Sequence, residues 1–399
     1  MRPSALAAVA LVAAALGATA ALVVGSLAGW VSHGAVTRTV VVPTTVADTG
    51  PRAAGSVALP LLGNGFDPAR IYANRSRGVV TIYSVYADGQ RAQGSGFVVS
   101  AAGHVLTNSH VVTNAGVGSA VRAASRVYVV FADGDRIPGK IVGWDLFDDI
   151  GLVKVDPDDH PVSPLPLGDS SRVVVGEPVA AIGSPFGEES SLAVGVVSAT
   201  DRSIASLTSA YDVSGAIQID APINHGNSGG PLLDARGRVI GLTAQIRSDS
   251  GNAEGVGFAI PINSARRSME QLIATGKVAY AYVGVTTQDV TPALARRYKL
   301  GAPRGALIES VVKDAPAARA GLHGATDRKV FNGIPISLGG DLIVAFAGKP
   351  VQRAADVARI VTNNLLPGDT VAVTVLRRGK GLRQTVRLRL TERPANPSG

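Results

Sequence analysis

The sequence predicts a mainly β protein with an apolar helix at its amino terminus and a small α+β domain at its carboxy terminus. Between Ala5 and Val31 the chain has no charged residue. The central part consists of short β-branched runs bounded by Gly, Asp and Asn, as expected of hairpins in a barrel or sandwich. Beyond Tyr280 strand and helix patterns alternate over about 110 residues, which predicts a separate small domain.

The composition excludes several classes of protein. Of the 399 residues, 46% are hydrophobic and only 17% are charged, so the chain is not intrinsically disordered. Cysteine is absent, which excludes a disulfide framework, a thiolate nucleophile and a cysteine-ligated zinc or iron–sulfur site. No cofactor and no metal are expected.

The net charge of +8 is concentrated at one end of the chain. From Val278 to Gly399 there are 18 Lys and Arg against 8 Asp and Glu, whereas the remainder has 20 against 22. The excess is scattered, apart from a cluster formed by Arg377, Arg378, Lys380 and Arg383. We interpret it as a solvated basic face; an anionic partner such as a membrane surface is the alternative, and nucleic acid is not expected.

The amino-terminal 31 residues are expected to form a membrane anchor. The 27 residues of Ala5–Val31 would span about 40 Å as a helix, enough to cross a bilayer with tilt. Trp30 suits the far interface, and Arg2 favours a cytoplasmic amino end, which leaves the folded part extracytoplasmic. The alternative is a signal peptide cleaved after Ala18–Ala20, giving a secreted or periplasmic protein.

Four further segments follow from composition. Residues 32–65 are an extracytoplasmic linker, 66–277 a β-rich domain, 278–392 the small domain and 393–399 a tail. In the β-rich domain we expect a first good helix only at Ser264–Thr275, and strands at Val79–Val85, Gly96–Ser100, Val127–Phe131, Ile137–Val142, Ile150–Val155, Pro178–Ile182, Ala193–Ala199, Ala216–Ile219, Val239–Gln245 and Gly257–Ile260.

Three short segments of the β-rich domain contain the residues of a serine hydrolase. They are Thr107–Val112 with His110, Asp148–Val155, and Gly226–Leu232 with Ser228. A serine hydroxyl needs a base within hydrogen-bond reach and a third group that orients the base. A lone histidine is more often structural, but three glycines around one serine suit an oxyanion hole.

The order of these residues distinguishes two classes of hydrolase. Gly226–Gly230 also fits the nucleophile elbow of an esterase or lipase, which requires a following helix and the order Ser, Asp, His. A proline ends the motif, and the only later histidine is His323 in the other domain. His110, Asp149 and Ser228 instead follow the order of two-barrel trypsin-like proteases.

At this level of detail the chain resembles the HtrA/DegP family of serine endopeptidases. The resemblance runs from about Asn74 to Gly276, through Leu106–Val112, Asp149–Val155, Leu167–Ser171, Ala181–Gly187, Gly195–Ala199, Gln218–Asn224, Gly226–Leu232 and Gly257–Pro261. The remainder resembles that family's PDZ domain, at Tyr282–Val285, Ala315–Leu322, Gly340–Val351 and Pro367–Val371. Two departures are His225, where many members have arginine, and the stretch 323–338, expected to be a lengthened PDZ loop.

The resemblance implies a trypsin-like double β-barrel followed by a PDZ domain, with Ser228 as nucleophile and His110 as base. It favours Asp149 over Asp148 as the orienting acid. The N–H groups of Gly226 and Ser228, spaced by Asn227, are expected to form the oxyanion hole.

Substrate contacts are expected near Thr243, Ala244 and Gln245. Pro222 falls at the floor of the pocket for the P1 residue, which then has no charge, and Asp220 is interpreted as structural. Such a pocket favours Val, Ala, Ile or Leu, with loose selectivity.

In the small domain Tyr282, Val283, Gly284 and Val285 are expected to bind a peptide carboxylate. The peptide would add as a strand beside a helix around Arg353–Asn363. The alternative is that this segment is only an edge strand of a packing module.

The implied function is a membrane-anchored, extracytoplasmic endopeptidase that degrades unfolded or misfolded exported proteins, with C-terminal peptides bound at the PDZ domain. The family is commonly trimeric, so a homotrimer is expected. The alternative is a PDZ-based binding protein or holdase with little proteolytic activity.

Overall fold

The computed structural model describes residues 65–115, 121–183, 191–223, 226–244, 256–379 and 381–395. The expected anchor, almost all of the expected linker, His225, Gln245 and the last residues of the tail lie outside these ranges. Across the ranges described, no helix combines the length and the apolar character needed to cross a membrane.

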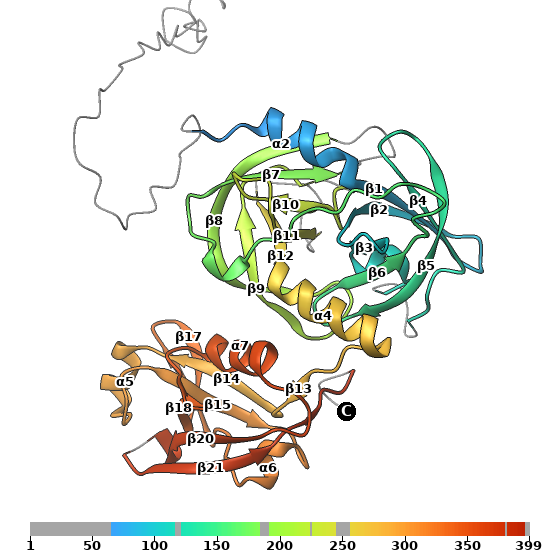
Figure 1. Ribbon diagram of the computed structural model, residues 1–399. Coiled ribbons are helices and arrows are strands. Elements are labelled where there is room, and N and C mark those ends of the chain that lie inside the picture. The colour runs from blue at the N-terminus through green and yellow to red at the C-terminus, as the bar shows by residue number, and fades with distance from the viewer. Residues whose placement is uncertain are drawn as a thin grey trace, which may run out of the picture. The chain divides into compact units, whose positions relative to one another are not determined.

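Six strands close into a first barrel in the order β1-β2-β3-β6-β5-β4 (Figure 1). Their alternate side chains, among them Val80, Ile82 and Val153, fill its interior. The short β3 directly precedes the segment that contains His110. The strands are β1 Val79–Val85, β2 Arg91–Val98, β3 His104–Thr107, β4 Arg126–Val130, β5 Arg136–Asp145 and β6 Ile150–Lys154.

A second barrel has the order β10-β11-β12-β9-β8-β7. Its strands are β7 Pro178–Gly183, β8 Ser191–Ala205, β9 Asp212–Ile219, β10 Pro231–Leu233, β11 Val239–Ala244 and β12 Gly257–Pro261. One apolar cluster joins both barrels, since Phe97 and Ile150 of the first pack with Ile182 and Leu242 of the second. Ser228, the candidate nucleophile, lies in a turn just before β10. The two barrels confirm the mainly β fold class.

Helices frame the two barrels. α4 (Ile262–Thr275) follows β12 and buries Ile262, Ala265 and Leu272, then ends at Gly276 in the left-handed conformation. We had expected α4 to be the first helix of this domain, but α2 (Pro68–Arg75) precedes both barrels. α2 begins with a proline in its first turn, and the Asp67 side chain caps it by accepting a hydrogen bond from the Arg70 N–H at 2.9 Å. The helix is polar and has too few apolar residues to show an apolar stripe in the sequence. The short helices are α3 Ser109–Val112, η1 Ser76–Gly78 and η2 Ser170–Arg172.

The carboxy-terminal domain has its own apolar core around Ile343, Phe346 and Val373. Its main sheet runs β14-β15-β18-β20-β21, with β19 beside β18. The elements are β13 Ala281–Tyr282, β14 Val285–Val290, α5 Pro292–Tyr298, β15 Gly305–Val311, α6 Pro316–Arg319, β16 Asp327–Phe331, β17 Ile334–Leu338, β18 Leu342–Phe346, β19 Lys349–Pro350, α7 Ala354–Asn364, β20 Thr370–Leu376, η4 Arg377–Gly379, β21 Arg383–Arg389 and β22 Thr391–Glu392.

The stretch expected to be a lengthened loop contains a β-hairpin. β16 pairs with β17, and Phe331 lies opposite Ile334. The turn residues Asn332 and Gly333 have φ of 51° and 81°, as a tight hairpin turn of the primed type requires. The Asn-Gly pair was the available sequence signal for this hairpin.

Candidate active site

His110 and Asp149 come together at one end of the first barrel. His110 lies in α3, directly after β3, and Asp149 lies directly before β6, the strand paired with β3. The Nδ1 atom of His110 is 2.8 Å from Oδ2 of Asp149. The pairing of β3 with β6 thus brings together two residues that are 39 positions apart in sequence.

Asp149 is held rigidly. Its Oδ1 accepts hydrogen bonds from the Ser109 hydroxyl at 2.7 Å and from the His110 N–H at 3.1 Å. Its carbonyl accepts from Nδ2 of Asn108 at 2.9 Å. The residue has φ of 50°, a conformation that costs energy outside glycine and persists only where the surroundings enforce it. Asn108 and Ser109, which directly precede the histidine, were not predicted as positioning residues.

The pKa of His110 is raised above its ordinary value. Burial alone would lower the pKa, but the charge of Asp149 and the hydrogen bond to it together outweigh burial. The neighbouring carboxylate therefore stabilises the protonated form of His110 relative to the neutral form.

Asp148 has a different partner. Its Oδ2 lies 2.9 Å from the Arg267 guanidinium of α4, and both side chains are largely buried. The geometry thus separates the two neighbouring acids: Asp149 contacts the imidazole, and Asp148 ties the preceding turn to α4.

Ser228 lies in a turn in which glycine is required. Gly226 and Gly229 have φ of 96° and 88°, which side chains rarely adopt. A Cβ on Gly229 would lie 2.2 Å from the Ser95 carbonyl and 2.6 Å from Oγ1 of Thr107. This close approach places the turn against the segment that leads into His110.

The Ser228 hydroxyl is buried and makes no hydrogen bond to any residue in the described ranges. Nucleophile–base hydrogen bonds are often long without substrate and tighten in the complex. The structure places the serine turn against the segment that leads into His110, and no hydrogen bond joins Ser228 to His110 in the described ranges.

Main-chain and side-chain groups from both barrels donate hydrogen bonds to this turn. The Ser95 N–H donates to the Ser228 carbonyl at 2.8 Å, and the Ser95 hydroxyl donates to the Gly226 carbonyl at 2.6 Å. From β11, the Thr243 hydroxyl donates to the Asn227 carbonyl at 2.5 Å. Ser95 was missed from sequence because 131 residues separate it from Gly226.

The expected substrate-binding residues are placed unequally. Thr243 is fully buried, and its hydroxyl is bonded to the serine turn, so any contact of this residue with substrate would come from its main chain. Ala244 follows it at the end of β11, and Pro222 is exposed. Oδ1 of Asp220 accepts from the Val196 N–H at 2.6 Å, in keeping with its structural interpretation.

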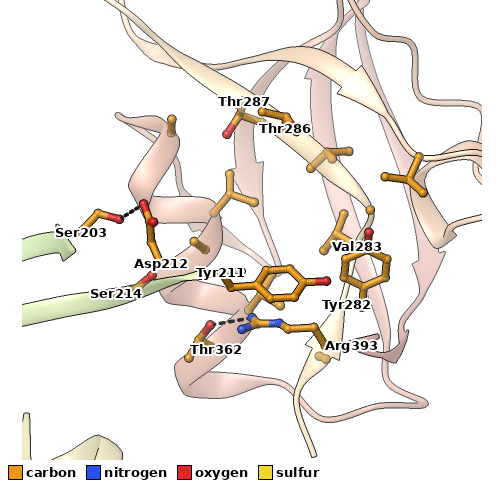
Figure 2. Close-up of a pocket in the computed structure, with 18 of the residues that line it drawn as sticks. Ser203, Tyr211, Asp212, Ser214, Tyr282, Val283, Thr286, Thr287, Thr362 and Arg393 are labelled. Atoms are coloured by element: carbon orange, nitrogen blue, oxygen red, sulfur yellow. Dashed lines mark hydrogen bonds between the residues drawn. The ribbon is translucent and has the colours of Figure 1, made fainter. Parts of the chain in front are cut away.

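In the carboxy-terminal domain the expected peptide-binding segment lines a pocket. Tyr282, Val283, Gly284 and Val285 lie on one side and α7 on the other, with Val357 and Val361 in the lining (Figure 2). Gly284 has φ of 79°, and a Cβ there would lie 2.1 Å from the Cβ of Ala315, so only glycine fits. Among the described strands, β14 pairs only with β15 and leaves its other edge toward α7.

The fold and the site define a trypsin-like serine peptidase domain followed by a PDZ domain. A model of the trypsin-like peptidase domain matches residues 94–242, and a PDZ model matches residues 281–389. The chain is similar to the HtrA-type protease AlgW solved with a tripeptide: 30% identity, 82% of this chain and 98% of that chain covered, and a TM-score of 0.68. The chain belongs to the HtrA family of serine proteases.

Curated relatives are named DegP-like periplasmic serine endoproteases. One from Hahella chejuensis is 38% identical over 312 residues, which cover 78% of this chain and 60% of that protein. One from Chlamydia trachomatis is 38% identical over 288 residues, which cover 72% of this chain and 52% of that protein. The chain thus spans just over half the length of these relatives.

Proposed function

We propose that this protein is an extracytoplasmic serine endopeptidase that hydrolyses unfolded or damaged exported proteins. The observation that carries the proposal is the Asp149–His110 pair beside a turn that contains Ser228 and requires glycine at positions 226 and 229. The periplasmic designation of its relatives supports the location. Retention of the amino-terminal segment as a membrane anchor belongs to the same proposal.

The proposed mechanism uses each group in turn. His110 accepts the Ser228 proton as Oγ attacks the scissile carbonyl, and later gives that proton to the leaving amine. Asp149 holds Nδ1 and stabilises the imidazolium. The N–H groups of Gly226 and Ser228 bind the oxyanion, at the turn that Ser95 and Thr243 hold in place.

Casein hydrolysis by the full chain tests this proposal. Wild type should release peptides, and the Ser228→Ala variant should not. If wild type binds unfolded casein and suppresses its aggregation without cleaving it, the holdase alternative replaces the protease.

The cleavage products should end in Val, Ala, Ile or Leu. Neither Ala244 nor Pro222 offers a charge to the P1 side chain, and the Asp220 carboxylate is occupied by a main-chain N–H. Since one methylene changes the rate only about 10–200-fold, several residues should be accepted. Mass spectrometry of casein digests measures this preference, and cutting mainly after Lys or Arg would contradict it.

Ser95→Ala should lower kcat about tenfold and leave KM nearly unchanged, since the hydroxyl acts on the oxyanion turn and not on the bound substrate. The affinity for a peptide aldehyde, which forms a tetrahedral adduct, should fall in parallel. Ser125→Ala is the matched control, because its hydroxyl also donates to a carbonyl, that of Val85 at 2.7 Å. A tenfold rise in KM with kcat retained would show that Ser95 supports substrate binding instead.

We propose that the PDZ pocket captures the free carboxy termini of apolar peptides. The peptide would extend the sheet at β14, with its carboxylate on main-chain N–H groups around Gly284. Amidation of the peptide should therefore weaken binding to the full chain at least tenfold by titration calorimetry. Equal affinity for free and amidated peptides would leave β14 as a packing edge.

We also propose that the protein forms a homotrimer. Sedimentation analysis of the detergent-solubilised full chain would give the mass of the assembly. A monomer at micromolar concentration would contradict the trimer.

A further inference from the structure

A cleft on the outside of the first barrel is lined by three arginines and two tyrosines. It measures about 540 Å³, and its lining contains Arg91, Arg126, Arg136, Tyr83 and Tyr128 but no Asp or Glu. We call it the arginine cleft. None of the functions proposed above uses it.

The strand register brings the three arginines together. Val85 of β1 lies opposite Arg91 of β2 on one side and opposite Arg126 of β4 on the other, so these two arginines stand about 10 Å apart across β1. The Arg136 guanidinium carbon lies 4.3 Å from the ring centroid of Tyr128 and 5.2 Å from that of Tyr83. Because the tyrosine rings contact the flat face of this guanidinium, its N–H groups, which point outward in the plane, can donate hydrogen bonds to an anion.

These cations have no acidic partner in the part of the chain that the structure describes. None of the three arginines forms an ion pair with a described Asp or Glu. The carboxylates in the adjacent turns serve the main chain: Asp88 accepts from the Gln90 N–H at 3.0 Å, and Asp135 from the Arg136 N–H at 2.9 Å. Three neighbouring arginines that form no ion pair with a described carboxylate favour an external anion.

The cleft lies on the strand that also reaches the nucleophile turn. Arg91 and Ser95 are four residues apart on β2, so they share a face and are separated by about 13 Å. Ser95 is hydrogen-bonded to Gly226, and the same barrel contains His110, the group that would protonate the leaving amine. If the leaving amine departs on the side of His110, the part of a substrate that follows the scissile bond runs over this barrel, toward β2.

We propose that the arginine cleft binds a carboxylate-bearing segment of the substrate polypeptide, about four residues beyond the scissile bond on its carboxy-terminal side. An extended chain covers about 13 Å in four residues, which matches the spacing along β2. The cleft would select where unfolded chains are cut, in addition to the P1 residue. The inference rests on the proposed endopeptidase function.

A binding experiment tests the cleft without requiring cleavage. The full chain with Ser228→Ala is titrated with a fluorescein-labelled Glu-rich octapeptide, amidated at its carboxy terminus so that carboxylate capture at the PDZ domain is blocked. Replacing Arg91, Arg126 and Arg136 by Gln should weaken binding roughly tenfold or more, and salt should weaken the wild-type interaction. The charge-matched control replaces Arg296, Arg387 and Arg389, exposed arginines of the PDZ domain, and should change affinity less than about twofold.

A kinetic experiment then tests the position. Two peptides that differ only by Glu or Gln at the fourth residue after the cut should differ in kcat/KM by roughly tenfold in wild type. They should become equal in the triple variant, with cleavage of the Gln peptide unchanged. If wild type cleaves no peptide, the proposed function fails, but the binding experiment still decides whether the cleft takes acidic peptides.

Two results would overturn the inference. Unchanged peptide affinity in the triple variant would show that the cleft is not the site. Binding of phosphatidylglycerol vesicles that depends on the three arginines, without binding of acidic peptides, would assign the cleft to the membrane surface.

Discussion

Ser228→Ala should lower kcat on casein by about 10⁶, and His110→Ala should lower it by a similar factor. The two groups act as one unit, because the serine attacks only as its proton passes to the imidazole. The double variant should therefore be hardly worse than either single variant. The turn around Ser228, with Gly226 and Gly229 at positive φ, would remain to bind the oxyanion and provide the residual rate.

Progress curves with a fluorogenic peptide, at enzyme concentrations scaled to each variant, measure these rates. The circular dichroism spectrum and the affinity for a product peptide are the controls for folding and for ground-state binding. Multiplicative losses in the double variant would mean that Ser228 and His110 act independently, which would contradict the shared proton transfer.

Local patterns were sufficient to predict much of the fold. β1 has the predicted bounds Val79–Val85, because six of its seven residues are β-branched or aromatic and turn residues lie on either side. The Asp149 strand and the glycine turn were recognised from short motifs. The mainly β architecture of a trypsin-like domain followed by a PDZ domain is confirmed.

The parts that could not be predicted depend on contacts between distant segments. Nothing near Ser95 in the sequence indicates that its hydroxyl would reach Gly226, and Arg267 reaches Asp148 across 119 positions. Likewise, nothing near Thr243 in the sequence indicates that its hydroxyl would bond the Asn227 carbonyl in the turn before β10. The arginine cleft is a fourth case, since it exists only because β1, β2, β4 and β5 are neighbours in a closed barrel.

Asp149→Asn should lower kcat by about 10⁴, because an amide no longer holds His110 in the tautomer that accepts the serine proton. The neighbouring acid supplies the matched control. Asp148 contacts Arg267 and not the imidazole, so Asp148→Asn should leave kcat within about threefold while destabilising the fold by roughly 3–5 kcal/mol, as expected when one partner of a buried ion pair is removed. Part of this cost is offset because Asp145, whose pKa is raised to about 6 by burial and by the charge of Asp148, would lose that repulsion.

The pH profile distinguishes a positioning acid from a merely structural one. His110 must be neutral to accept a proton, so activity falls as the pH decreases through its pKa, which Asp149 raises above the ordinary value against the opposing effect of burial. The acidic limb of the kcat/KM profile should therefore lie above pH 6.5 in wild type and in Asp148→Asn. In Asp149→Asn the charge and the carboxylate hydrogen bond are lost while burial remains, so the limb should move to lower pH. Rates measured from pH 5 to 9, at a temperature well below unfolding, would show this shift. The proposed roles of the two acids would be contradicted by an acidic limb that does not shift in Asp149→Asn, or by a large loss of kcat in Asp148→Asn.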